Sequence, residues 1–148
     1  MLLELARKIW RFIPYKMRLL LIRVTQDKFT VSVVALIINS EKKALILDHY
    51  IRPGSSWGLP GGFIEPAEEP SEAIRREIRE ETGIELGEVE LMEVRTVRRH
   101  IEILFLARSD GEARIGSREI RDLGWFSADD LPGGMNERQK DLVRKMTR

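Results

Sequence analysis

The first stretch of the chain combines apolar residues at helical spacing with basic residues on the opposite side. The apolar positions recur three and four residues apart: Leu2, Leu5, Ala6, Ile9 and Ile13. Arg7, Lys8 and Arg11 fall on the other side of the same helical wheel, and Pro14 interrupts the pattern. The spacing predicts an amphipathic, basic helical segment within residues 1–24.

Two interpretations of this segment are open. An apolar helical face is usually buried against protein, so packing on this domain or on a second copy is the favoured one. The alternative is a helix that lies on an anionic membrane surface with Trp10 and Phe12 inserted. Both interpretations set residues 1–24 apart from the remaining chain, residues 25–148, which we expect to form one domain.

From Phe29 onward the pattern changes to β-branched and aliphatic runs separated by polar turns. TVSVVALIIN and ALILDHYI, joined by SEKK, predict a β-hairpin, and PGSSWGLPGG after them predicts turns. PSEAIRREIREET then carries a helical pattern that Gly83 ends. Further strands are predicted over residues 88–98, 101–107 and 119–127, with a closing helix over 136–147. Strands and helices in this order favour an α+β fold in which helices pack on a mixed sheet.

Composition narrows the classes of protein that fit. A chain of 148 residues suits one domain with its own core. Its formal charge of +1 gives no general attraction to nucleic acid, so no DNA binding is expected. The absence of cysteine excludes disulfides and thiolate zinc sites and fits a cytoplasmic protein. The longest apolar runs are far shorter than the roughly 20 residues that span a bilayer.

Three glutamates crowd one side of the predicted helix. Glu77, Glu80 and Glu81 stand three and four positions apart, a spacing at which each like-charge pair costs an isolated helix roughly 0.2–0.5 kcal/mol. A divalent cation bound by these carboxylates would offset that repulsion, because magnesium and manganese prefer oxygen ligands. The alternative is a solvated surface helix whose arginines compensate the acids, such as Arg76 with Glu80. The helix alone does not decide between them.

The residues around the helix decide in favour of the cation. Residues 62–84 read GFIEPAEEPSEAIRREIREETGI, which is G, five residues, E, seven residues, REI, one residue, EE, one residue, GI. This stretch resembles the Nudix box of the Nudix hydrolases at every specified position. The lead-in WGLPGG and the later GWFSADDLP are also similar to that family, so the resemblance extends over about residues 30–132. It implies an α/β/α sandwich with a mixed β-sheet.

The resemblance also implies a reaction and roles for residues. Nudix hydrolases use water and magnesium or manganese to split the pyrophosphate bond of a nucleoside diphosphate linked to another group. Carried over to this chain, Glu77, Glu80 and Glu81 are metal ligands, together with a backbone carbonyl at Gly61 or Gly62, and Arg76 orients them. The general base is Glu80 or Glu119, an acid in the polar loop six residues before Trp125.

Residues beyond the box are candidates for substrate binding. Arg52 could hold phosphate, and Trp57 could stack on a base, although packing beneath the site is the favoured role for that indole. Arg99 stands between two predicted strands and could reach the substrate edge. The sequence leaves the nucleotide derivative open.

Two further expectations concern partners and turnover. A homodimer through the closing helix is one expectation for the assembly. A regulatory module that binds nucleotide without turnover is the alternative to an enzyme, although this box retains all its acids.

Overall fold

The computed structural model describes residues 2–52 and 54–147 and divides them into two compact units. The first unit, up to Thr30, holds α1 (Leu2–Phe12) and α2 (Tyr15–Thr25). The helix predicted before Pro14 is confirmed, and the residues after Pro14 form a second helix. Residues 25–30 belong to this first unit, whereas the sequence placed them with the domain that follows. None of the helices in the described part of the chain is long and apolar enough to cross a membrane.

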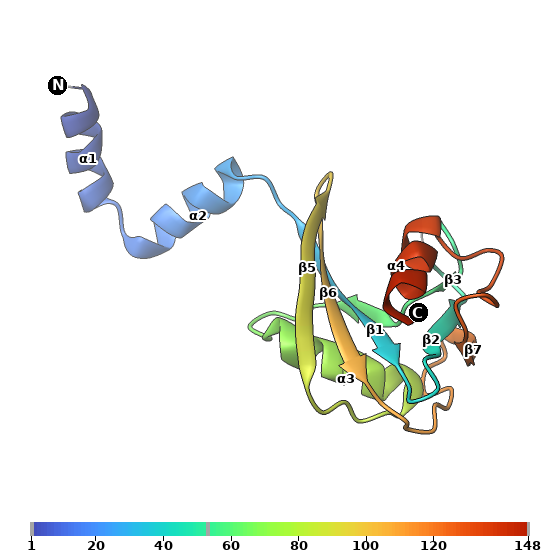
Figure 1. The fold of residues 1–148 in the computed structure, drawn as a ribbon. Helices are drawn as coiled ribbons and strands as arrows, with labels where there is room; N and C mark the ends of the chain where they lie inside the picture. Colours follow the sequence, from blue (N-terminus) through green and yellow to red (C-terminus); the bar gives the residue numbers. More distant parts are fainter. Residues whose placement is uncertain (1, 53, 148) are drawn as a thin grey trace. The chain divides into compact units, whose positions relative to one another are not determined.

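The second unit, from Val31, is built around a sheet that has seven strands in the described residues (Figure 1). The strands are β1 (Thr30–Ile38), β2 (Ala44–His49), β3 (Trp57–Gly58), β4 (Gly61–Phe63), β5 (Val89–Val97), β6 (His100–Arg108) and β7 (Ile120–Phe126). Their order is β3-β2-β1-β6-β5, and β4 pairs with β1 while β7 pairs with β2. The arrows of β1 and β6 run in the same direction in Figure 1, whereas β1 pairs antiparallel with β2. The predicted mixed sheet is therefore confirmed.

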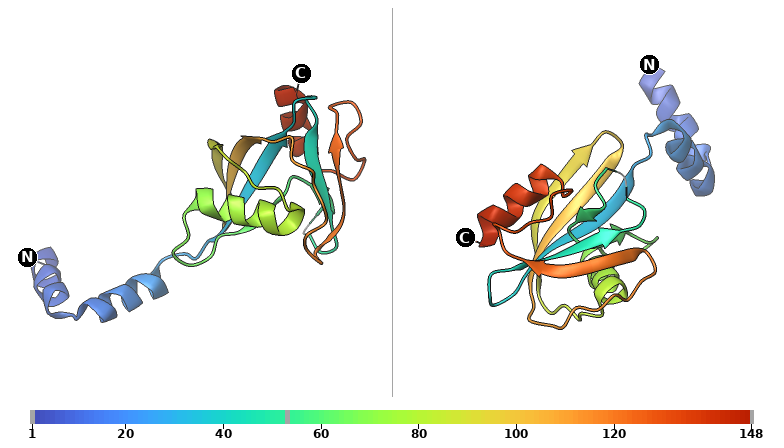
Figure 2. Two further views of the ribbon diagram at one scale, coloured as in Figure 1. Left: turned by 90° about the horizontal axis from the view of Figure 1, so that it is seen from below. Right: turned by 90° about the vertical axis from the view of Figure 1, so that its right-hand side faces the viewer.

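The two remaining helices, α3 (Pro70–Thr82) and α4 (Glu137–Thr147), cover opposite faces of this sheet (Figure 2). Alternate residues of β1 explain the arrangement, because successive side chains of a strand point to opposite faces. Val33 packs in a cluster with Ile74 of α3, and Val34 packs in a second cluster with Val143 of α4. The architecture is the predicted α/β/α sandwich.

Two short strands fall where the sequence predicted only turns. β3 and the first two residues of β4 lie within PGSSWGLPGG, which is rich in glycine and proline. Their pairing depends on partners that are distant in sequence, since Gly61 is in register with Val34 and Gly58 with Leu47. Local propensity carries no signal for such pairing.

We expect Ile74→Ala to lower the free energy of unfolding by about 2–5 kcal/mol, because Ile74 is fully buried between α3 and the sheet. Urea unfolding at neutral pH measures this loss. Ile115→Ala makes the same chemical change at a side chain that is 52% exposed and should cost far less. Equal losses in the two variants would contradict the packing described for α3.

Candidate functional site

The glycine-containing strand β4 runs along the acidic side of α3, and each of its residues meets one functional side chain. The Gly61 N–H donates to Glu81 Oε2 at 3.0 Å. The next residue, Gly62, lies against the carboxylate of Glu77. The carbonyl of Phe63 accepts a hydrogen bond from Arg76 Nη2 at 3.1 Å. Three consecutive backbone positions therefore set the places of three side chains on the helix.

Both glycines lie at points of close approach. A Cβ on Gly61 would lie 2.1 Å from the carbonyl oxygen of Val33, and its φ of 145° is a conformation that favours glycine. A Cβ on Gly62 would lie 2.4 Å from the carboxylate carbon of Glu77. The first contact is with backbone and the second with the end of a flexible side chain, so the two glycines serve different purposes.

Arg76 is the centre of the ionic network. Its Nε donates to Glu68 Oε1 at 2.8 Å and its Nη2 to Glu68 Oε2 at 2.9 Å, which is a two-pronged pair. Its Nη1 donates to Glu77 Oε1 at 2.8 Å and lies 3.4 Å from Glu80 Oε2. The hydrogen bonds from Arg76 lower the pKa of Glu68 to about 2, and the bond to Glu68 raises the pKa of Arg76. The predicted orienting role thus has a geometric basis.

The three clustered glutamates have different surroundings. Glu81 is buried beneath Gly61, whereas the side chain of Glu80 is 55% exposed. Burial raises the pKa of Glu77, and the negative charges of Glu81 and Glu80 raise it further. The hydrogen bond from Arg76 lowers this pKa but does not cancel the rise. Within residues 2–52 and 54–147, no three acidic or histidine side chains converge closely enough to hold a metal together. Metal ligation by Glu77, Glu80 and Glu81 therefore stays a prediction.

His49 belongs to this site and was not singled out from the sequence. Its Nε2 lies 3.4 Å from Glu81 Oε1, and both side chains are buried. Its Nδ1 lies 3.2 Å from the carbonyl oxygen of Ser56, which can only accept, so Nδ1 carries the proton. A signal was present, because His49 follows Leu45 and Leu47 at alternate positions, the two strand residues that face α3.

The loop before β7 covers the end of α3. The backbone N–H of Arg114 donates to the carbonyl of Thr82 at 2.8 Å, and that of Gly116 donates to the carbonyl of Glu81 at 2.9 Å. The same loop leads to Glu119, whose carbonyl accepts from the N–H of Tyr50 at 2.9 Å, directly after His49. The exposed Glu119 is thereby brought to the strand end that carries His49.

The predicted substrate residues lie in three different places. Arg52 Nη1 donates to the carbonyl of Leu59 at 3.3 Å, and burial lowers the pKa of Arg52 while the charge of Glu81 acts in the opposite direction. Trp57 packs edge-on against Phe126, with ring centroids 5.6 Å apart, in the cluster that faces α4. The indole therefore packs on the α4 side of the sheet, whereas the sequence placed its packing beneath the site.

Arg99 lies exposed in the turn between β5 and β6. The next residue, His100, connects this turn to the neighbourhood of β4. Its Nε2 is 2.9 Å from Ser32 Oγ, and its ring contacts that of Phe63 edge-on. Substrate contact by Arg99 stays a prediction.

The different roles of the two glycines can be tested by unfolding measurements. We expect Gly61→Ala to lower the free energy of unfolding by about 1–3 kcal/mol, because alanine is strained at that φ and meets the Val33 backbone. Gly62→Ala should change it by less than about 1 kcal/mol, since only the flexible end of Glu77 has to move. Urea titrations of both variants make the comparison. Equal destabilisation would argue against this arrangement of β4.

The Arg76–Glu68 pair makes stability depend on pH. Because the folded-state pKa of Glu68 is about 2 and its ordinary value is 4.5, the pair stabilises the fold above pH 4.5. That contribution is lost as pH falls from 4.5 to about 2. Unfolding free energies measured across this range should fall less steeply for Glu68→Gln than for the unsubstituted chain. Glu85→Gln, which removes an exposed carboxylate, is the control for loss of one negative charge.

Comparison with known proteins identifies related sequences. A model of the NUDIX domain matches residues 28–146. The m7GpppN-mRNA hydrolase dcap-2 of Caenorhabditis elegans is 35% identical over 106 residues, and the aligned region covers 66% of this chain but 14% of that protein. The nucleoside triphosphatase NudI of Escherichia coli is 33% identical over 100 residues, covering 57% of this chain and 70% of that protein.

The fold comparison agrees with the sequence comparison. A crystal structure of a MutT NUDIX hydrolase from Burkholderia pseudomallei has a TM-score of 0.70 and 28% identity to this chain, and it covers 80% of this chain and 98% of that one. The family model matches well over half of the chain. The chain therefore belongs to the Nudix hydrolase family.

Proposed function

We propose that this chain is a metal-dependent pyrophosphohydrolase that cleaves the diphosphate linkage of a nucleoside diphosphate joined to another group. The observation that carries the proposal is the placement of Glu77, Glu80 and Glu81 on the side of α3 that β4 and Arg76 hold in position. Such a cluster is electrostatically unfavourable by itself. Its occurrence within a Nudix domain supports a role in catalysis.

The residues present fit a hard divalent cation. All candidate ligands are oxygen donors, namely the carboxylates of Glu77, Glu80 and Glu81 and the backbone carbonyl of Gly61, which suits magnesium or manganese. Glu80 and Glu81 lie in the last turn of α3, where the helix dipole also favours positive charge. When bound, the cation would neutralise charge on the phosphate oxygens and activate water.

Other steps of the proposed reaction, positioning the acids and accepting a proton from water, fall to side chains of this chain. Arg76 positions Glu77 by a hydrogen bond and ties the helix to the preceding loop through Glu68. Glu80 is the exposed member of the cluster and would accept the proton from the attacking water. Glu119 is the competing base, because its loop is anchored beside the strand end that carries His49.

Two observations support a substrate that contains phosphate groups joined to a nucleoside: the names of related proteins and the cationic side chains of this chain. The nematode relative is named for a capped mRNA and the bacterial relative for nucleoside triphosphates, and both compounds join phosphate groups to a nucleoside. Arg52 and Arg99 would supply positive charge to such phosphates. Trp57 is a weaker candidate for stacking on a base, because its ring already packs against Phe126.

We expect Glu80→Gln and Glu81→Gln each to lower kcat by roughly a hundredfold or more while the fold is retained, because each removes a metal ligand or a base. The measurement is release of phosphate and nucleotide from a panel of triphosphates, nucleotide sugars, dinucleotides and triphosphorylated RNA, with and without magnesium. Glu90→Gln, an exposed acid on β5, serves as the matched control.

The same assay separates the competing interpretations. A loss in Glu119→Gln as large as that in Glu80→Gln would assign the base to Glu119. Near-normal turnover in both Glu80→Gln and Glu81→Gln would remove the mechanism. Tight nucleotide binding without turnover of any compound would favour the binding module over the enzyme.

A further inference from the structure

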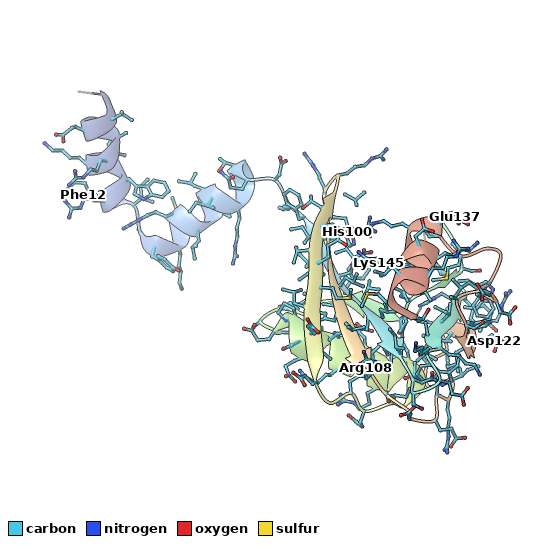
Figure 3. All side chains as sticks on the ribbon, viewed as in Figure 1. Phe12, His100, Arg108, Asp122, Glu137 and Lys145 are labelled. Carbon is cyan, nitrogen blue, oxygen red and sulfur yellow. The ribbon has the colours of Figure 1, made fainter. Side chains whose placement is uncertain are left out.

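The first helix of the chain has one basic and one apolar side. Ile9 and Phe12 lie on the apolar side of α1 and are 55% and 89% exposed. Figure 3 labels Phe12, whose ring projects from the end of α1. Arg7 and Arg11 lie on the opposite side, and Trp10 follows Ile9 by about 100° around the helix, at the boundary between the two sides.

The second helix is apolar around most of its circumference. Five of its large apolar side chains have exposed fractions between 43% and 75%, namely Met17, Leu20, Leu21, Ile22 and Val24. None of the residues of α2 is buried. Exposed apolar surface of this extent usually marks an interaction site, and the first unit does not itself cover it.

The two residues between the helices, Ile13 and Pro14, are hydrogen-bonded to α2. Arg18 Nε donates to the carbonyl of Ile13 at 2.7 Å, and the Arg18 N–H donates to the carbonyl of Pro14 at 3.1 Å. These bonds attach Ile13 and Pro14, the two residues between the helices, to the first turn of α2. We define α1, these two residues and α2 as the anchor segment, residues 2–25.

Charge distinguishes between two of the possible covers, a second copy of the segment and an anionic bilayer. The anchor segment contains one acid, Glu4, and six basic residues, which are Arg7, Lys8, Arg11, Lys16, Arg18 and Arg23. Its formal charge is thus +5, and the rest of the chain carries −4 of the total of +1. A second anchor segment would bring +5 against +5, which opposes self-association. An anionic bilayer offers apolar material and negative charge at the same surface.

The dimensions of the helices fix how they would meet a bilayer. Each has eleven residues and is about 16 Å long, against a hydrocarbon core about 30 Å thick. They are therefore suited to lie in the plane of the interface. Trp10 at the boundary of the two sides matches the preference of tryptophan for the headgroup region.

We propose that the anchor segment binds the surface of an anionic phospholipid bilayer, with Ile9, Phe12 and the apolar residues of α2 among the acyl chains and the basic residues at the headgroups. This attachment would hold the Nudix domain near a membrane without a membrane-spanning helix. It is independent of which nucleotide derivative the domain hydrolyses.

The experiment is co-sedimentation of the full chain with vesicles of phosphatidylcholine alone and of phosphatidylcholine mixed with phosphatidylglycerol. We expect binding to the mixed vesicles that weakens as salt is raised, and at least tenfold weaker binding to the neutral ones. Tryptophan fluorescence should shift to shorter wavelength on binding, because Trp10 enters the headgroup region. The variant Trp10→Phe should not show this shift, which would show that the signal comes from Trp10 and not from Trp57 or Trp125.

Substitutions in the full chain test the apolar and the electrostatic contributions to membrane binding separately. The double variant Ile9→Asp, Phe12→Asp should abolish binding. The triple variant Arg7→Gln, Lys8→Gln, Arg11→Gln should weaken it at least tenfold. The control removes three exposed positive charges from the other unit by Lys42→Gln, Arg108→Gln and Lys145→Gln, and it should bind as the unsubstituted chain does. Circular dichroism checks that each variant is folded.

Three outcomes would overturn the proposal. Absence of binding to both vesicle types would indicate that the anchor segment is covered by protein. Equal binding to both types, unaffected by the triple variant, would remove the electrostatic component. A dimer detected by sedimentation equilibrium without vesicles, and lost in the Ile9→Asp, Phe12→Asp variant, would assign the apolar side to a second copy.

Discussion

The ion pair between Arg76 and Glu68 is the interaction on which the acidic side of the molecule depends. A guanidinium presents several N–H donors in a fixed plane, and this one serves the loop before α3 through Glu68, the helix through Glu77 and the strand β4 through the carbonyl of Phe63. A lysine ammonium could not reach three directions with the same geometry. One side chain therefore fixes loop, helix and strand relative to one another.

Around this pair, backbone and side chains share the task of holding negative charges together. Glu81 is held by a backbone N–H of Gly61, while Glu77 is held by Arg76 and confined against Gly62. Glu80 has weaker restraint and remains exposed. The three carboxylates thus differ in burial and in hydrogen bonding although they lie within five positions of the sequence.

The sequence predicted the framework because the relevant signals are local. The helix that carries Ile74 and ends at Gly83 follows from spacing and from the left-handed conformation of that glycine, whose φ is 72°. The two-sided burial of β1 follows from an uninterrupted apolar run. Family resemblance located the acids and Arg76, which the structure joins through hydrogen bonds.

Other parts of the site depend on contacts between residues far apart in the chain. The contact of His49 with Glu81 joins positions separated by 32 residues, so the alternation along β2 predicts the face on which His49 lies but not the residue that it meets. The short strand β4 exists because Gly61 and Gly62 pair with β1, not because of their own propensity. The anchoring of Glu119 likewise depends on its partner Tyr50.

The loop before β7 touches the end of α3 through its main chain. Because Arg114 and Gly116 donate backbone N–H groups to the carbonyls of Thr82 and Glu81, most side chains of the loop are uninvolved in that attachment. Gly116 is the exception, since a Cβ there would lie 2.4 Å from the Glu80 carbonyl. Apart from Ala113, which packs against the core cluster, the other side chains between residues 112 and 118 can therefore change without loss of the two main-chain hydrogen bonds that hold this loop on α3.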